Sequence, residues 1–224
     1  MQVSVVMKPT RRKRYTRILA PLVGIIEERK GMTINNNKNI AIFLDRDGTI
    51  IEDNGHLSDL SEIVFFQKAF EALLRLRKYF LLFIVTNQPG VARGLISRED
   101  VNYINSGIVK RFIKAGIEFT DIYVCPHERS NNCDCIKPKP YFLQKAAKDY
   151  HIDLQRSFVV GDHPCDVQLA KNVGARGIFV LTGHGHKHVA ELPEDTEIAS
   201  GIMEAAGKII SYHLEATVSG SEIA

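Results

Sequence analysis

The sequence lacks the features that would place it in a specialised structural class. Its longest apolar stretch, residues 18–26, has nine residues, whereas a membrane-spanning helix needs about 20. The chain has only four cysteines and no long repeat or low-complexity tract, which excludes a disulfide-dense miniature and a collagen-like chain. Its 224 residues are 45% apolar and 25% charged, a composition typical of a globular protein with one sizeable domain or two small ones.

Charge of one sign dominates only at the start of the chain. The formal net charge is +3, but residues 1–31 alone carry +6, so the remainder carries −3. Because the basic character belongs to this segment alone, we expect no nucleic-acid partner. No small-residue cleavage site follows the apolar stretch, which argues against a signal peptide. We expect residues 1–38 to be a poorly ordered basic extension, or an upstream start before Met32.

From residue 39 onward, short apolar runs alternate with segments whose apolar residues recur every three or four positions. The apolar runs are continuous, as in strands buried on both faces of a parallel sheet, and cover Ile40–Leu44, Leu81–Val85, Ile122–Cys125, Phe158–Val160 and Ile178–Leu181. The expected helices are Ala69–Tyr79, Ser97–Ala115 with Ser97 as its cap, Tyr141–Tyr150, Pro164–Val173 and 198–215. This alternation predicts one α/β domain over residues 39–215, a doubly wound parallel sheet with helices on both faces. Residues 216–224 are expected to be a tail.

Two carboxylates directly follow the first expected strand, in Asp45-Arg46-Asp47-Gly48-Thr49. At the C-terminal edge of a parallel sheet, where functional residues gather, Asp45 is suited to bind a metal and attack an electrophile. Asp47 is suited to protonate a leaving group, and Gly48 permits a sharp turn. The alternative for this motif alone is an acidic turn that caps the next element.

The other strand ends favour the chemical interpretation. Thr86, Asn87 and Gln88 end the second strand with a hydroxyl and amides, and Gly161-Asp162 ends the fourth, with Asp166 four residues further on. Asp45 and Asp162 supply the oxygen ligands that Mg²⁺ prefers. A metal, a nucleophilic carboxylate, a lysine and a hydroxyl around one point are what phosphoryl transfer requires.

Four segments together resemble the motifs of the haloacid dehalogenase (HAD) phosphatases: Asp45–Thr49, Thr86, Lys137 and Gly161-Asp162. They occur in the family's order, and the match covers about residues 39–185. The resemblance implies that Asp45 becomes an aspartyl-phosphate, that Asp47 is the acid/base, and that Thr86 and Lys137 hold the phosphoryl group. It also implies that Mg²⁺ is bound by Asp45, Asp162 and the backbone carbonyl of Asp47. Lys139 competes with Lys137 for the third motif, but Lys137 fits better.

The loop before Lys137 contains three cysteines and a histidine within eleven positions: Cys125, His127, Cys133 and Cys135. This is the stoichiometry of a closed tetrahedral Zn²⁺ site, in which four protein ligands leave no open position for catalysis. Two disulfides or buried free thiols are the alternatives, but cysteine pairing does not account for the histidine. We therefore expect a structural zinc that holds the loop delivering Lys137.

A zinc loop and a minimal cap resemble two related groups of HAD phosphatases. These are the D-glycero-D-manno-heptose 1,7-bisphosphate 7-phosphatases and the histidinol-phosphate phosphatases, and the segments around His56, Asn87 and Thr182 look more like the former. Their substrate-contacting segments correspond to Asp53, Asn54, Gly55, His56, Thr86, Asn87, Gln88, Pro89, Lys137 and His163. Ile136 departs from the family's usual arginine and His163 from a frequent lysine, so the sugar is less well specified than the chemistry.

The favoured function is thus a Mg²⁺-dependent phosphatase acting on a small phosphorylated sugar. Its alternatives are a histidinol-phosphate phosphatase or another small phosphomonoesterase, and a zinc-stabilised binding module without turnover. We expect a cytoplasmic monomer with no membrane partner. His184, His186 and His188 alternate along a glycine-rich loop, for which solvent exposure is favoured over a second metal site.

Overall fold

The computed structural model of the chain describes residues 38–221. The basic extension predicted from the sequence lies outside these residues, apart from Lys38. The strands are β1 (Ala41–Leu44), β2 (Leu81–Asn87), β3 (Asp121–Cys125), β4 (Phe158–Gly161), β5 (Arg176–Val180) and β6 (Glu197–Ala199). The α-helices are α2 (Ala69–Leu76), α3 (Arg98–Lys114), α4 (Tyr141–Tyr150), α5 (Pro164–Val173), α6 (Gly185–His188) and α7 (Ile202–Ser221). Short 3₁₀ helices cover Leu60–Glu62, Arg129–Asn131, Leu154–Arg156 and Val189–Glu191.

The six strands form one parallel sheet in the order β3-β2-β1-β4-β5-β6. The chain runs outward from β1 to β3, then returns to the other side of β1 and runs outward again to β6. The order therefore reverses beside β1, and in open α/β sheets this is where a crevice for ligands forms.

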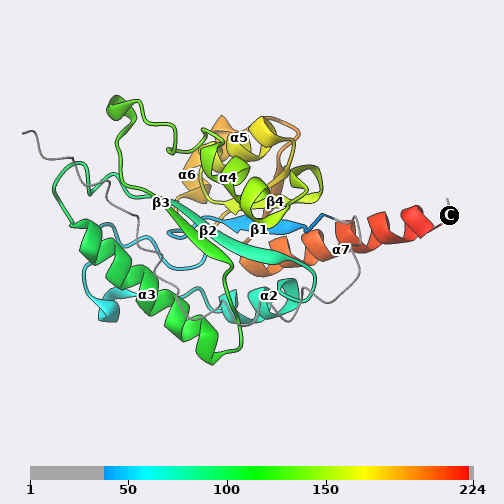
Figure 1. Cartoon of the computed structure of the whole chain (residues 1–224), viewed down its shortest axis with the longest axis horizontal. Coiled ribbons are helices and arrows are strands. Elements are labelled where there is room, and N and C mark those ends of the chain that lie inside the picture. Colours follow the sequence, from blue (N-terminus) through cyan, green and yellow to red (C-terminus); the bar gives the residue numbers. More distant parts are fainter. Residues whose placement is uncertain (1–37, 222–224) are drawn as a thin grey trace, which may run out of the picture. The chain divides into compact units, whose positions relative to one another are not determined.

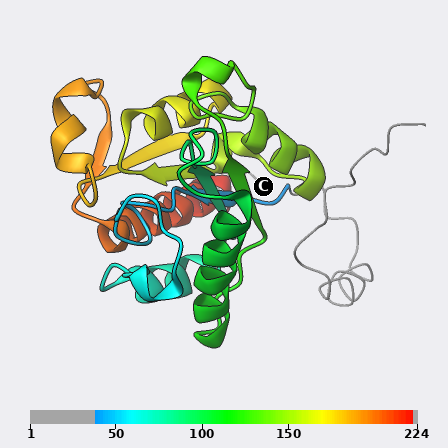
Figure 2. The same ribbon diagram turned by 90° about the vertical axis from the view of Figure 1, so that its left-hand side faces the viewer.

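Helices cover both faces of this sheet (Figures 1 and 2). Successive side chains of β1 point to opposite faces, as in any strand: Ile42 and Leu44 join a core with α2, α3 and α7, whereas Ala41 and Phe43 join a core with α4 and α5. All four are fully buried. This explains why the strand sequence is continuously apolar rather than alternating.

The predicted α/β architecture is confirmed, and α4 and α5 have the predicted ends. Ser97 caps α3 in a capping box with Asp100. Among residues 38–221, no helix is long and apolar enough to cross a membrane.

Two boundaries near the C-terminus differ from the prediction. A short sixth strand, β6, occupies part of the segment expected to begin the last helix, and α7 begins only at Ile202. The helix then continues to Ser221, so residues 216–221 are helical rather than a tail. No proline or glycine interrupts the chain between Glu215 and Gly220, so nothing there breaks the helical hydrogen bonding.

Candidate active site

The predicted catalytic carboxylates meet where β1 and β4 end side by side. Asp45 follows the last residue of β1 and Asp162 follows the last residue of β4, and these strands are in register at Leu44 and Val160. Oxygen atoms of Asp45, Asp162 and Asp166 all lie within 4.8 Å of one another. Three carboxylates around one point form a hard donor set of the kind that Mg²⁺ binds, so these residues fit the metal that the sequence predicts.

Lys137 offsets part of this negative charge. Its Nζ lies 2.6 Å from Asp45 Oδ1 and 2.7 Å from Asp166 Oδ1, and its side chain is 4% exposed. Burial raises the pKa of Asp45 well above its usual value, and the charge of Lys137 opposes this rise. Burial also lowers the pKa of Lys137, but the carboxylates of Asp166 and Asp45 outweigh it and raise the pKa. A buried ammonium that stays charged can neutralise a phosphoryl group beside Asp45.

The turn after β1 brings the backbone of Gly48 against Asp162. Gly48 has φ +76°, and a Cβ at this position would lie 2.0 Å from Asp162 Oδ2. The backbone N–H of His184 donates to the same oxygen at 2.8 Å. Burial raises the pKa of Asp162 to about 6, against the effect of this hydrogen bond. The carboxylate is therefore fixed by close packing that only glycine permits.

We expect Gly48→Ala to lower kcat at least tenfold and to destabilise the fold, since a methyl group would displace the Asp162 carboxylate. The left-handed backbone conformation alone costs about 1–2 kcal/mol for a residue with a Cβ. Gly94→Ala is the matched control, because Gly94 has φ +68° but no atom within 4 Å of its Cβ position. Thermal unfolding and kinetics of both variants test this. Equal kcat in the two would show that the contact with Asp162 is unimportant.

Asp47 is held by side chains from two segments, the turn after β1 and the end of β2. Gln88 Nε2 donates to Asp47 Oδ2 at 2.7 Å and to Thr86 Oγ1 at 2.9 Å, and Thr86 Oγ1 lies 3.5 Å from Asp47 Oδ2. Arg46 donates to Asp47 through Nε at 3.0 Å and through Nη2 at 2.9 Å. The carboxylate remains 16% exposed. It is therefore oriented by the protein while still open to solvent.

Sequence reasoning missed the supporting roles of three buried residues. Asp166, noted only for its spacing from Asp162, is 2% exposed and binds Lys137. Arg46 is 1% exposed, and its Nη1 donates to Asn105 in α3 at 2.8 Å. The separation of four positions from Asp162 is a recognisable signal for Asp166 alone. No sequence pattern indicates that the Arg46 side chain is buried or that it donates a hydrogen bond to Asn105 in the middle of α3.

The predicted substrate-contacting residues have more varied surroundings. Asn87 Oδ1 accepts a hydrogen bond from the backbone N–H of Lys137 at 3.1 Å. The Asn87 side chain therefore fixes the backbone at Lys137. His163 caps α5 by accepting from the N–H of Cys165 at 3.2 Å. Pro89 is half-buried in the loop after β2. The amide oxygen of Asn87 and the amide nitrogen of Gln88 thus bind protein atoms.

Residues 53–56 form an exposed loop beside Gly90 and His184. Asp53 Oδ1 accepts from the N–H of Gly55 at 3.0 Å, and Asp53 Oδ2 lies 3.6 Å from His184 Nδ1. Asn54 Nδ2 donates weakly to the carbonyl of Glu62, at 3.4 Å. His56 packs against Gly90, where a Cβ would lie 2.6 Å from the imidazole Nδ1. The loop therefore contacts both the loop after β2 and the segment after β5.

The three alternating histidines lie on or beside the short helix α6. The rings of His163 and His188 have centroids 4.6 Å apart, and those of His184 and His188 are 6.5 Å apart. His188 Nδ1 lies 2.6 Å from a carboxylate oxygen of Glu191. Within residues 38–221, only the carboxylate cluster and the cysteine–histidine cluster have metal-binding spacing, so the histidines do not form a further candidate metal site there.

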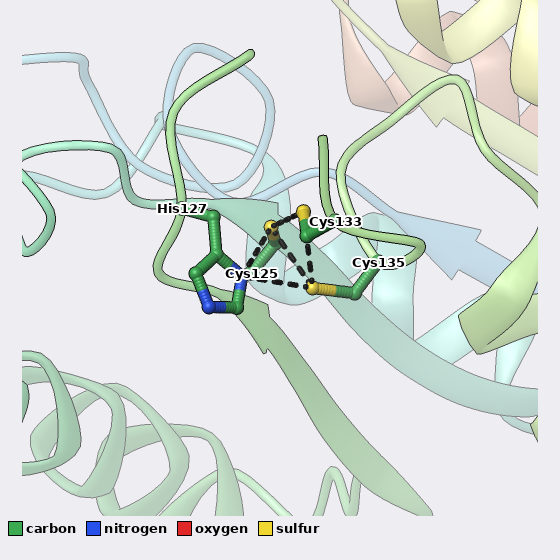
Figure 3. Close-up of side chains that lie close together, drawn as sticks. All are labelled: Cys125, His127, Cys133 and Cys135. Atoms are coloured by element: carbon green, nitrogen blue, oxygen red, sulfur yellow. Dashed lines mark hydrogen bonds between the residues drawn. The ribbon is translucent and has the colours of Figure 1, made fainter. Parts of the chain in front are cut away.

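The four predicted zinc ligands lie together at the end of β3 and in the loop that follows (Figure 3). The sulfur atom of Cys135 lies 3.1 Å from that of Cys125, 3.6 Å from that of Cys133 and 3.3 Å from His127 Nδ1. Ligands of a tetrahedral zinc with bonds of about 2.3 Å are roughly 3.8 Å apart. Burial raises the pKa of the Cys125 thiol, a cost that a bound metal offsets by stabilising the thiolate. The donor set and spacing fit Zn²⁺.

A cleft of about 490 Å³ lies along α5, next to the cysteine–histidine loop. Arg129 of the cysteine–histidine loop, His163 and Cys165 at the start of α5, and Lys171 further along α5 line it, together with Glu191. His163 directly follows Asp162 in the chain, but neither the three carboxylates nor Lys137 line the cleft. Its volume is in the range of small-molecule sites. The side chains of Arg129 and Lys171 suit an anionic ligand, whereas Glu191 opposes one.

A parallel sheet of this topology with carboxylates after β1 and β4 defines a HAD-type hydrolase, and comparison with known proteins agrees. Residues 134–205 match the model of a family described as HAD-hydrolase-like. The D-glycero-β-D-manno-heptose-1,7-bisphosphate 7-phosphatase of Pasteurella multocida is 37% identical over 151 residues, which are 64% of this chain and 82% of the relative. The bifunctional histidine biosynthesis protein HisB of Campylobacter jejuni is 36% identical over 141 residues, 61% of this chain and 40% of that protein.

The solved structures lead to the same family. The D,D-heptose 1,7-bisphosphate phosphatase of B. bronchiseptica, crystallised with magnesium and phosphate, superposes with a TM-score of 0.72 at 30% identity. The match covers 77% of this chain and 99% of that structure. The chain therefore belongs to the HAD-like phosphatase family that includes the heptose-bisphosphate phosphatases and the HisB proteins. It spans less than half the length of the bifunctional HisB relatives.

Proposed function

We propose that this protein is a Mg²⁺-dependent phosphatase that works through an aspartyl-phosphate on Asp45. The observation that carries the proposal is the buried Asp45 carboxylate, 2.6 Å from the ammonium of Lys137 and beside Asp162 and Asp166. Asp45, Asp162 and the carbonyl of Asp47 would hold Mg²⁺, which would neutralise charge on the phosphoryl oxygens. Lys137 and Thr86 then hold those oxygens from the other sides.

The proposed reaction has two steps. A carboxylate oxygen of Asp45 attacks phosphorus as the ester bond breaks, and Asp47 donates a proton to the departing alkoxide. Asp47 then removes a proton from a water molecule that attacks the aspartyl-phosphate, which releases inorganic phosphate and restores Asp45. The water-accessible edge of Asp47, 16% exposed, suits both transfers.

We infer that the preferred substrate is D-glycero-β-D-manno-heptose 1,7-bisphosphate, cleaved at the 7-phosphate. Support comes from relatives with that activity in their names, which this chain matches over 82% and 99% of their lengths. The cleft beside His163, with Arg129 and Lys171 on its wall, offers room and positive charge for the rest of a bisphosphate.

Histidinol phosphate is the second candidate, favoured by the similarity to HisB and by Ile136. The Ile136 side chain is 9% exposed and places an apolar group immediately before Lys137. Without a guanidinium at position 136, the site suits a substrate with one phosphate better than it suits a bisphosphate.

We also infer that the cysteine–histidine cluster holds a structural Zn²⁺. The four cysteines of the chain are free thiols, and thiolate ligands persist in a reducing compartment. We further propose that the enzyme is a monomer that acts in the cytoplasm.

The proposal predicts Mg²⁺-dependent phosphate release, with kcat/KM at least tenfold higher for the heptose bisphosphate than for histidinol phosphate. Phosphate release from both compounds would be measured with Mg²⁺, with EDTA, and after Mg²⁺ is restored. The reverse preference would move the assignment to histidinol phosphate. Failure to release phosphate from either compound or from an aryl phosphate would favour the binding-module interpretation.

A further inference from the structure

Arg46 is a fully buried cation between the two acids of the first motif. It is 1% exposed and is the largest of the fully buried side chains among residues 38–221. A charged side chain is almost never fully buried unless it is paired. Its partners are the Asp47 carboxylate and Asn105, a 5% exposed residue in the middle of α3.

The geometry uses every nitrogen of the guanidinium. Nε lies 3.0 Å from both oxygens of Asp47, Nη2 lies 2.9 Å from Oδ2, and Nη1 donates to Asn105 Oδ1 at 2.8 Å. A planar guanidinium bound through two adjacent nitrogens fixes the plane of the carboxylate as well as its distance. Asn105 in turn fixes the plane of the guanidinium. Helix α3, whose residues do not otherwise contact Asp47 through a hydrogen bond, thus orients Asp47 through Arg46.

Stability alone does not explain this arrangement. A buried ion pair contributes little compared with apolar side chains of similar volume, because desolvating the charges offsets their attraction. Apolar residues at both positions 46 and 105 would remove this buried hydrogen bond without leaving either of its partners unpaired. What the network does provide is a single orientation for the one carboxylate that must reach the leaving oxygen, and proton transfer is sensitive to that orientation.

We propose that Arg46 and Asn105 are positioning residues for proton transfer by Asp47. The proposal rests on the proposed phosphatase function. Proton donation matters most when the leaving group is a poor one, such as the alkoxide of a sugar. It matters little for an activated aryl leaving group such as p-nitrophenolate, which departs without a proton. A loss of positioning therefore has a signature that a general loss of structure lacks.

Asn105→Ala tests the proposal in single-turnover cleavage of the heptose bisphosphate and of p-nitrophenyl phosphate. We expect cleavage of the sugar ester to slow by about 10- to 100-fold, a part of the roughly 10²–10⁴-fold that acid–base catalysis supplies. Cleavage of the aryl ester should slow less than about threefold, and the affinity for both substrates should equal that of the wild type. Asn105→Asp retains an acceptor oxygen and should keep most of the rate.

Val109→Ala is the matched control for stability. Val109 lies one helical turn further along α3, is 8% exposed, and packs in the core without contacting Arg46 by a hydrogen bond. It should lower the melting temperature and leave both rates unchanged in folded protein. Equal slowing of both esters by Asn105→Ala, or no slowing while the wild type is active, would overturn the positioning role. A wild type that cleaves neither ester would instead refute the proposed function, and the positioning role with it.

Discussion

Asp45→Asn is expected to lower kcat by about 10³-fold or more while the protein remains folded. The amide has nearly the volume of the carboxylate but cannot attack phosphorus or form an acyl phosphate. Burial raises the pKa of Asp45 because it penalises the carboxylate charge, and the nearby carboxylates of Asp166 and Asp162 act in the same direction. A neutral side chain there therefore costs little stability, and Lys137 keeps its ion pair with Asp166 at 2.7 Å.

Steady-state kinetics and thermal unfolding together test this expectation. Asp149→Asn is a suitable control, because Asp149 is 41% exposed on α4 and pairs with Lys145 at the surface. It removes one negative charge and should leave kcat unchanged. An Asp45→Asn protein that retained a tenth of the wild-type kcat would exclude Asp45 as the nucleophile, and the aspartyl-phosphate with it.

Cys133→Ser is expected to release zinc, lower the melting temperature by several degrees and reduce kcat at least tenfold. The effect should reach the active site because the loop is short: Cys135 is two residues from Lys137, whose ammonium lies 2.6 Å from Asp45. Loss of one thiolate from a four-ligand site couples metal release to unfolding of the loop. Metal analysis, unfolding curves and kinetics would be measured on the same preparations.

Cys165→Ser separates this effect from the loss of a thiol in general. Cys165 lies on α5 outside the cluster, where burial raises the pKa of its thiol. The variant should keep one zinc per chain. Wild-type protein without zinc after purification in reducing, chelator-free buffer would contradict the metal assignment. So would a Cys133→Ser protein as stable and as active as Cys165→Ser.

Much of the fold follows directly from the sequence. The strands are continuously apolar because the sheet is covered on both faces, and the helices between them are long enough to show their periodicity. The strand β6 escaped prediction because three residues, of which Ile198 is 37% exposed, leave almost no pattern. Helix α7 was predicted too short because its last turns have little apolar periodicity and Val218 is 63% exposed.

The candidate active site likewise contains residues that the sequence predicts and contacts that it does not. Residues that directly follow strands, such as Asp45 and Asp162, are predictable because parallel strands end at one edge of the sheet. The zinc ligands are predictable because they are close in sequence and chemically distinctive. The contacts of Arg46 with Asn105, and of Asn87 with Lys137, join residues 59 and 50 positions apart. Only tertiary packing brings these pairs together, so no local sequence pattern predicts the contacts.

The most direct test of the proposed activity is the ³¹P NMR spectrum of the heptose bisphosphate after incubation with the wild-type protein and Mg²⁺. We expect one equivalent of inorganic phosphate, loss of the 7-phosphate signal and a persistent 1-phosphate signal, and we expect EDTA to abolish these changes. An unchanged spectrum, or loss of the 1-phosphate instead, would contradict the proposed activity.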